Sequence, residues 1–307
     1  MTPRRIFLTG ATGFVGRHLV PKLREAFPAA ELASDRVDVT DADALRARVR
    51  ALRPDACVHL AAVTTLAAAR RNPDRAWRVN LHGTIELAAA LLAEAPECVL
   101  LHVSSSEIYG ASFRAGVALD ESAAAAPMNA YAATKAAADL ALGAMVNEGL
   151  RVIRLRPFNH TGPGQSPDFV VPAFARQIAR IETGLQPPVM RTGALDPRRD
   201  FLDVRDVYAA YIACLQRADT LASGTILNIA SGVARRIGDI LTDLLNLSGL
   251  RVSVECQQSL LRRSEIAIAT GRSEAAHAAL AWEPQIPWTD TLRDVLDDWR
   301  LRVRQEK

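Results

Sequence analysis

A glycine-rich turn near the start of the chain restricts its possible folds more than any other feature. The apolar run 6–8 predicts a short buried strand, and residues 17–26 predict a helix. Between them stand Gly10, Gly13 and Gly16, spaced G-x-x-G-x-x-G. A strand, a glycine-rich turn and a helix in this order are typical of a dinucleotide-binding unit, whereas the glycine triplet alone is weak evidence.

Each glycine has a physical role in such a unit. Gly10 permits the tight turn, and Gly13 lets backbone N–H groups approach a pyrophosphate at the start of the helix. Gly16 lets the helix pack closely on the strand. The sequence therefore predicts a bound dinucleotide, NAD or NADP.

Strands and helices alternate after this unit. Further strands are predicted at 31–34, 36–39, 56–60, 98–103, 152–155 and 225–229, and helices at 42–52, 74–92, 130–146, 171–183 and 204–217. This order predicts the α/β class, with a Rossmann doubly wound parallel sheet and a smaller, discontinuous α/β substrate lobe. The NAD(P)-binding domain is expected at residues 1–158 and about 200–230. The lobe is expected at about 159–199 and 231–307.

The end of the second strand is where a Rossmann fold contacts the adenosine ribose. Asp35 stands there and Arg36 follows it. An acid would bind the 2′-hydroxyl of NAD and an arginine the 2′-phosphate of NADP, so the sequence leaves the two cofactors open. Asp38 and Val39 could flank the adenine; alternatively, Asp38 and Asp41 cap the helix at 42–52.

Candidate proton-transfer groups lie further along. Ser105 follows the strand at 98–103, where ligands bind in α/β sheets. Tyr131 and Lys135 are four residues apart and share one helix face. A nearby ammonium favours the phenolate and lowers the pKa of a tyrosine, so that the phenol exchanges protons near neutral pH. Y-x-x-x-K is a short pattern that alone favours an exposed tyrosine and lysine on an ordinary helix. The cofactor turn and Ser105 favour the catalytic interpretation.

Composition excludes several classes of protein. Net charge is +3 and aromatic residues make up 5%, without a basic block, which argues against a nucleic-acid partner. No apolar run reaches the ~18 residues of a membrane span, and no signal peptide is recognisable, so we expect a cytoplasmic protein. The four cysteines are far apart and form no C-x-x-C pair, and Cys57, Cys98 and Cys214 lie in apolar runs that predict core thiols. His59 is expected to be a core histidine.

Over essentially its whole length the chain resembles the extended short-chain dehydrogenase/reductase family, the NAD-dependent epimerases and dehydratases. The motifs that carry the resemblance are T-G-A-T-G-F-V-G (9–16), H-L-A-A (59–62), S-S-S-E-I-Y-G (104–110), Y-A-A-T-K (131–135) and R-D-F-L-D-V-R-D (199–206). R-P-F-N-H-T-G-P-G-Q (156–165) and L-R-R-S-E (261–265) look most like the GDP-6-deoxy-D-mannose reductases and are also similar to the GDP-mannose 4,6-dehydratases.

The resemblance implies an NAD(P)H-dependent reduction at C4 of a nucleotide sugar, best GDP-4-keto-6-deoxy-D-mannose to GDP-D-rhamnose. A 4,6-dehydratase or 4-epimerase that retains NAD(P) is the alternative. A binding protein without chemistry is a third, although such proteins usually lose the tyrosine or the lysine. Glu107 stands where dehydratases carry the glutamate that removes the C5 proton, while S-S-S-E itself resembles the reductases.

The resemblance also implies roles for single residues. Ser105 would hydrogen-bond the reacting oxygen, Tyr131 would be the acid/base, and Lys135 would hold the nicotinamide ribose. Arg263 stands where the family has a proline. The cofactor-binding set is Gly10, Thr12, Gly13, Phe14, Val15, Gly16, Asp35, Arg36, Asp38, Val39, Leu60, Ala61, Ala62, Asn80, Val103, Tyr131, Lys135 and Phe158. The substrate-binding set is Ser106, Glu107, Asn159, Val170, Arg191, Arg199, Arg262 and Glu265, with the base near 185–189.

The helices at 74–92 and 130–146 are apolar around much of their circumference, which is more than one buried face needs. Because the family often pairs these helices between subunits, we expect a homodimer. Deep burial within one subunit is the alternative.

Overall fold

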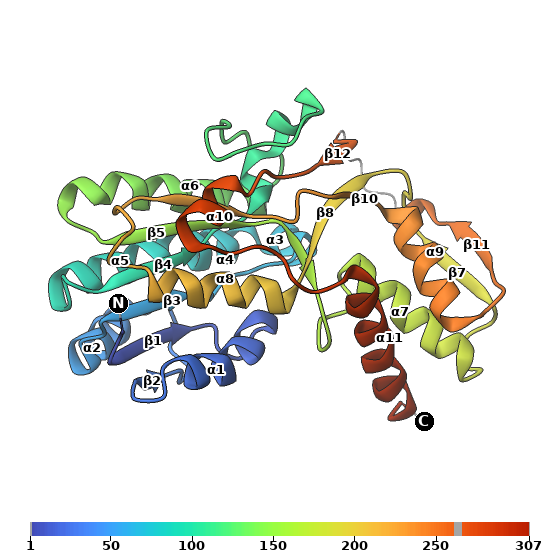
Figure 1. Ribbon diagram of the computed structural model, residues 1–307, viewed down its shortest axis with the longest axis horizontal. Coiled ribbons are helices and arrows are strands. Elements are labelled where there is room, and N and C mark those ends of the chain that lie inside the picture. The colour runs from blue at the N-terminus through green and yellow to red at the C-terminus, as the bar shows by residue number, and fades with distance from the viewer. Residues whose placement is uncertain (1, 261–265, 307) are drawn as a thin grey trace.

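A parallel six-stranded sheet forms the larger part of the computed structural model, which describes residues 2–260 and 266–306 (Figure 1). Its strand order is β2-β1-β3-β4-β5-β9. The predicted α/β class with a Rossmann sheet is confirmed. The strands are β1 (Arg5–Thr9), β2 (Glu31–Ala33), β3 (Ala56–His59), β4 (Val99–Val103), β5 (Val152–Pro157) and β9 (Ile226–Ile229).

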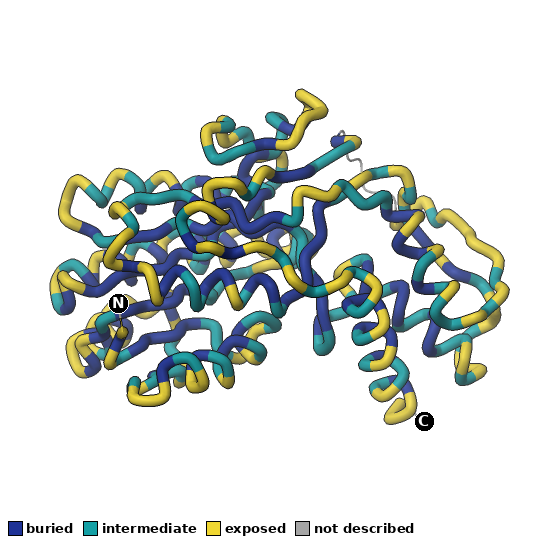
Figure 2. Tube along the Cα trace, in the orientation of Figure 1, coloured by how far each residue is buried: buried dark blue, intermediate teal, exposed yellow. Residues whose placement is uncertain are grey.

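Helices cover both faces of this sheet, which explains the apolar runs of its strands. Along β1, Ile6 and Leu8 face α1 (Phe14–Ala26) and α8 (Val204–Gln216), whereas Phe7 faces the opposite layer. That layer consists of α2 (Ala42–Leu52), α5 (Gly83–Glu94) and α6 (Ala130–Met145). The strands are accordingly the most continuously buried segments in Figure 2.

A second assembly lies at the right of Figure 1 and has its own apolar core. It combines α7 (Val170–Glu182), α9 (Ile237–Ser248) and α11 (Trp288–Arg304) with the parallel pair β7 (Val189–Thr192) and β11 (Ser253–Cys256). A small sheet connects it to the larger part. In that sheet β10 (Ala234–Arg236), β12 (Ile268–Ala269) and β6 (Asn159–Thr161) all pair with β8 (Arg198–Asp203). The other α-helices of the described residues are α3 (Leu66–Arg71), α4 (Pro73–Trp77) and α10 (Glu274–Leu280).

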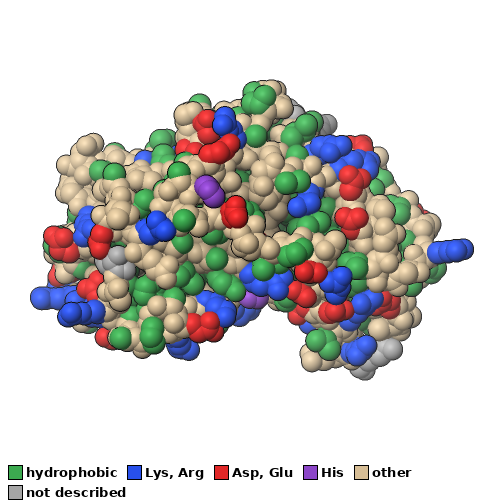
Figure 3. Space-filling model, viewed as in Figure 1, with side chains coloured by type: hydrophobic (Ala, Val, Ile, Leu, Met, Phe, Trp, Pro, Cys, Tyr) green, Lys and Arg blue, Asp and Glu red, His purple; other side chains and the backbone are tan. Residues whose placement is uncertain are grey.

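The surface and the cysteines agree with the composition. On the face in Figure 3, acidic and basic side chains are interspersed. Cys57, Cys98 and Cys214 are buried, unpaired core residues, as predicted. Within residues 2–260 and 266–306, we find no helix that is both long and apolar enough to cross a membrane.

The strand predicted at 36–39 is absent. Arg36 and Asp38 are exposed, and the Asp38 carboxylate accepts hydrogen bonds from the backbone N–H and the hydroxyl of Thr40 at 2.9 and 2.8 Å. A side chain that bonds its own backbone two residues on favours a turn over a strand ladder. Asp41 caps α2 by accepting the N–H of Ala44, so the capping alternative is correct for Asp41.

The single helix predicted at 74–92 is divided into α4, a π-helical turn at Arg78–His82, and α5. The buried Asn80 accounts for the interruption. Its side-chain amide accepts the Val63 N–H at 2.7 Å and donates to the Val63 carbonyl at 3.1 Å and to the Thr134 hydroxyl at 3.0 Å. The π-turn thus places an amide that fastens the segment after β3 to α6.

Candidate active site

A cavity of about 1800 Å³ opens at the carboxyl ends of the parallel strands. Ligands of doubly wound sheets bind at this edge, where the strand order reverses. Its walls come from both parts of the molecule, with the segments that follow β1, β3 and β4 on one side and α7, β7 and β8 on the other. Of the predicted site residues that the structure describes, all line the cavity except Asn80, whose amide instead bonds Val63 and Thr134. The predicted Arg262 and Glu265 lie outside the described residues.

The glycine turn forms the floor of the cofactor end. Gly10 has φ +74°, and a Cβ there would lie 2.6 Å from the Ala61 nitrogen. The turns after β1 and β3 therefore touch at this glycine. A Cβ on Gly16 would lie 2.4 Å from the Gly10 carbonyl oxygen, so its role is to let α1 approach the turn itself rather than the strand. Gly13 is the N-cap of α1, which aims the N–H groups at the start of this helix into the cavity.

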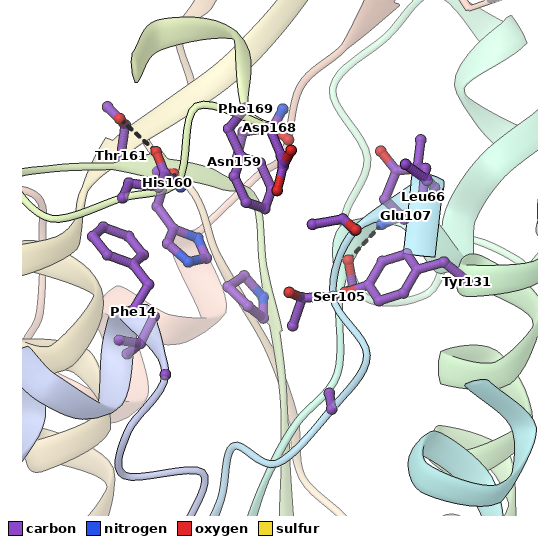
Figure 4. A pocket seen from close by; sticks show the side chains of 18 of the residues that line it. Phe14, Leu66, Ser105, Glu107, Tyr131, Asn159, His160, Thr161, Asp168 and Phe169 are labelled. Atoms are coloured by element: carbon purple, nitrogen blue, oxygen red, sulfur yellow. Dashed lines mark hydrogen bonds between the residues drawn. The ribbon is translucent and has the colours of Figure 1, made fainter. Parts of the chain in front are cut away.

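Ser105 and Tyr131 lie side by side across the cavity from Phe14 (Figure 4). Ser105 follows β4, and its Oγ accepts the Glu107 N–H at 3.2 Å. Tyr131 stands in the first turn of α6, which begins there because the Asn129 side chain accepts the Ala132 N–H at 2.8 Å. Lys135 is buried one turn later and donates to the Val103 carbonyl at 2.6 Å.

The pKa directions correct one expectation. Burial raises the pKa of Tyr131 to about 12, with the Glu107 carboxylate adding to the rise and the Ser105 hydroxyl opposing it. The pKa of Tyr131 is thus raised rather than lowered as expected, and the Lys135 ammonium donates to the Val103 carbonyl. Burial lowers the pKa of Lys135 itself to about 8. The phenol is therefore a proton donor at neutral pH.

Glu107 has a defined position in the cavity, near the start of α6. The Asn129 amide donates to its carboxylate at 3.3 Å, so the residue that caps α6 also orients Glu107. Arg199, on β8, faces Glu107 and bonds the carbonyls of Arg198 and Ile266. Burial lowers the pKa of Arg199, and the Glu107 carboxylate opposes that shift. The site thus places one carboxylate and one guanidinium beside the Ser105–Tyr131 pair.

At the adenosine end, Asp35 and Arg36 differ in their bonding. The Asp35 carboxylate is paired with Arg48 of α2 at 2.7 Å, and this hydrogen bond lowers its pKa. Arg36 is exposed on the cavity wall and lies near Asp38, whose pKa is lowered by the hydrogen bonds from Thr40 and, to a smaller extent, by Arg36. The carboxylate of Asp35, which would bind a ribose hydroxyl, is therefore already paired with the Arg48 guanidinium.

Aromatic side chains line the middle of the cavity. Phe158 is buried and packs against Tyr109 and Phe113, with ring centres 6.4 and 6.1 Å apart. His160 lies nearly parallel to Phe14 at 6.2 Å (Figure 4). Burial lowers the pKa of His160, so it is neutral at physiological pH. The sequence did not predict that His160, on β6, packs against Phe14 at the start of α1.

His59 is a core residue, as expected. Its two ring nitrogens lie 2.7 Å from the Thr9 hydroxyl and 2.9 Å from the Thr84 hydroxyl, and burial lowers its pKa to about 3. The imidazole is neutral and holds β1, β3 and α5 together beneath the cavity.

Sequence reasoning missed a polar wall on α7. Arg176 and Arg180 both pair with Glu306, and Gln177 brackets the Arg191 backbone, accepting its N–H at 2.8 Å and donating to its carbonyl at 3.0 Å. All but Glu306 line the cavity. The helix itself was predicted from the sequence. The face that it turns toward the cavity is set by its packing against β7, and no local pattern in the sequence predicts that packing.

Comparison with known proteins identifies the family. The model of the NAD dependent epimerase/dehydratase family matches residues 6–230. The chain belongs to this family. The match spans the glycine turn, Ser105, Tyr131 and Lys135, and the family predicted from the motifs is confirmed.

Individual relatives cover nearly the whole chain. It is 38% identical over 306 residues to the GDP-6-deoxy-D-mannose reductase of Pseudomonas aeruginosa, covering 99% of each chain. It is 26% identical to the GDP-6-deoxy-D-talose 4-dehydrogenase of Aggregatibacter actinomycetemcomitans, covering 85% of this chain and 86% of that protein. Among solved structures, RMD from Pseudomonas aeruginosa complexed with NADPH has a TM-score of 0.85 and 35% identity, covering 97% of this chain and 99% of the other.

Proposed function

We propose that the protein is an NAD(P)H-dependent reductase of the C4 keto group of a nucleotide sugar, with GDP-4-keto-6-deoxy-D-mannose as substrate and GDP-D-rhamnose as product. The observation that carries the proposal is the pair of Ser105 and Tyr131 beside a glycine turn that leaves room for a dinucleotide. The full-length similarity to a GDP-6-deoxy-D-mannose reductase supports this choice of sugar.

In the proposed reaction the bound NAD(P)H supplies the hydride, and the chain supplies the proton and the alignment. The Ser105 hydroxyl donates a hydrogen bond to the keto oxygen and so orients the carbonyl. Tyr131, protonated at neutral pH, gives its proton to that oxygen as the negative charge develops. Arg191 and Arg199 hold the diphosphate, since a guanidinium forks onto two oxygens. The division into a cofactor domain and a substrate lobe remains part of this proposal.

The direct test is to incubate purified protein with GDP-4-keto-6-deoxy-D-mannose and either reduced cofactor. Loss of the reduced-nicotinamide absorbance with formation of a GDP-6-deoxyhexose is the expected result. Folded protein that oxidises neither NADH nor NADPH in the presence of the keto sugar would exclude the proposal.

A 4,6-dehydratase activity depends on Glu107 acting at C5. The Glu107 carboxylate accepts a hydrogen bond from the Asn129 amide and lies near Arg199, which supports a role in binding rather than in proton abstraction. We therefore expect GDP-mannose, without added reduced cofactor, to remain unchanged. A keto product in that experiment, together with NAD(P) retained through purification, would establish the dehydratase instead.

We infer that NADPH binds more tightly than NADH, because Asp35 is paired with Arg48 while Arg36 lines the cavity. Arg36→Ala should weaken binding of 2′,5′-ADP by about tenfold, the worth of one charge-assisted contact, and leave 5′-ADP unchanged. Isothermal titration calorimetry measures both. Arg46→Ala is the control, since Arg46 is on α2 and pairs with Glu94 away from the cavity. Equal affinity of the unmodified chain for the two nucleotides would contradict the inference.

A homodimer through α5 and α6 is proposed on an exposed apolar strip. Leu140 is 61% exposed on α6, with Ala144 nearby on the same helix and Ala89 exposed on α5. Leu140→Arg should convert a dimer to a monomer in sedimentation at micromolar protein, because a buried unpaired charge is costly. Leu301→Arg, equally exposed on α11, should leave the dimer intact. A monomeric mass for the unsubstituted chain would refute the dimer.

The cytoplasm remains the proposed location, where NAD(P)H and sugar nucleotides are available.

A further inference from the structure

A buried carboxylate lies behind the catalytic helix face. Asp139 follows Lys135 by one helical turn, so Tyr131, Lys135 and Asp139 recur every fourth residue on α6 and share one side. Asp139 has no exposed surface and does not line the cavity. It therefore cannot contact a substrate in the cavity and can act only through its neighbours.

Two arginines of β5 share this carboxylate. Arg156 donates to its two oxygens, from Nη2 at 2.9 Å and from Nε at 3.3 Å. Arg154 donates from Nη1 to the same carboxylate at 3.2 Å and to the Asp139 backbone carbonyl at 3.1 Å. The single negative charge of Asp139 therefore interacts with two guanidinium groups and with the Lys135 ammonium.

Among the described residues, the other groups around Lys135 carry no compensating charge. Val103 offers a backbone carbonyl, and β3 and β4 present the neighbouring rings of His59 and His102. Burial lowers the pKa of both histidines, which are therefore neutral, and on α6 the Tyr131 phenol is neutral as well. Within the described part of the chain, Asp139 is the charged group that raises the pKa of Lys135, against the larger effect of burial.

We propose that Asp139 is the positioning residue that keeps Lys135 protonated in the active site, and that Arg154 and Arg156 limit how strongly it does so. This inference concerns Lys135 of the proposed reductase and rests on that function for its kinetic consequence. The physical basis is the Coulomb interaction between buried groups: removing the anion favours the neutral amine, and removing a competing cation favours the ammonium.

The two changes must therefore act in opposite directions. Asp139→Asn should lower the pH at which Lys135 loses its proton by about one unit, and Arg154→Met should raise it by about half a unit. Arg154 is the better arginine to replace, because Arg156 also donates to the Tyr109 hydroxyl and the Glu121 carbonyl. A loss of packing alone would not produce shifts of opposite sign.

The lysine content allows a direct measurement. The chain has three lysines, Lys22, Lys135 and Lys307, so a sample labelled with carbon-13 at lysine Cε gives few resonances, and Lys135→Met assigns the one of interest. Titration of the unsubstituted chain should show Lys135 changing near pH 8 and Lys22 well above it, because a hydrogen bond to Glu25 raises the pKa of Lys22. Asp206→Asn is the matched control, since Asp206 is a buried carboxylate on α8 that accepts the N–H groups of Gln285 and Ile286 and should leave the Lys135 midpoint unchanged.

The kinetic readout is the pH profile of kcat/KM with the keto sugar. The alkaline limb should move to lower pH in Asp139→Asn and to higher pH in Arg154→Met. Should Asp139→Asn not fold, the upward shift in Arg154→Met decides alone, and an unmoved Lys135 midpoint there overturns the proposal. Opposite shifts in the resonance of a chain that reduces no keto sugar would support the inference while excluding the proposed function.

Discussion

Tyr131→Phe is expected to lower kcat for keto-sugar reduction by roughly 10²- to 10⁴-fold, the usual contribution of a positioned general acid. The substitution keeps the ring and removes the proton. Because burial holds the pKa of Tyr131 near 12, the phenol carries its proton across the neutral range, and this is the form that reduction consumes. Affinity for the cofactor should change little, since the hydroxyl is directed at Ser105 (Figure 4).

The matched control is Tyr208→Phe. Tyr208 is a partly buried tyrosine on α8 that does not line the cavity, so loss of its hydroxyl should leave kcat within about twofold, the ordinary effect of a remote surface change. Steady-state kinetics and cofactor titration on the three proteins separate catalysis from folding. A Tyr131→Phe variant with undiminished kcat would show that another group protonates the sugar oxygen.

The parts of the structure that the sequence could predict are those fixed locally. A strand, a glycine turn and a helix follow one another directly, so the tight turn at Gly10 could be assigned before any tertiary contact was known, whereas Gly16 was expected against the strand and lies against the turn. The same holds for the shared face of Tyr131 and Lys135, which requires only helix geometry.

The remaining parts depend on partners distant in sequence. Nothing near Asn80 indicates that its amide bonds Val63 and Thr134, and this contact is what converts a long helix into two helices joined by a π-turn. In the same way, Lys135 bonds a carbonyl at the end of β4, 32 residues away, and the burial that raises the pKa of Tyr131 arises only in the folded chain. Charges and helix faces could be predicted; their competition for partners could not.

Gly16→Ala is expected to abolish measurable cofactor binding while much of the fold persists. The new methyl carbon would stand 2.4 Å from the Gly10 carbonyl oxygen and 2.6 Å from that of Ala11. Both oxygens belong to backbone, which cannot swing aside as a side chain can. The turn and the start of α1 must separate, and the N–H groups aimed at the pyrophosphate lose their alignment. Overpacking of this kind costs about 1–3 kcal/mol of folding stability.

Gly249→Ala separates this steric effect from a general loss of stability. Gly249 ends α9 at φ +69° with open space around it, so alanine there strains the backbone by about 1 kcal/mol and displaces nothing. Urea unfolding should show both variants weakened, whereas calorimetric titration with NADPH should show lost binding in Gly16→Ala only. If Gly16→Ala bound NADPH with the affinity of the unsubstituted chain, the cofactor would not bind at this turn. The proposed position of the hydride beside Tyr131 would then be wrong as well.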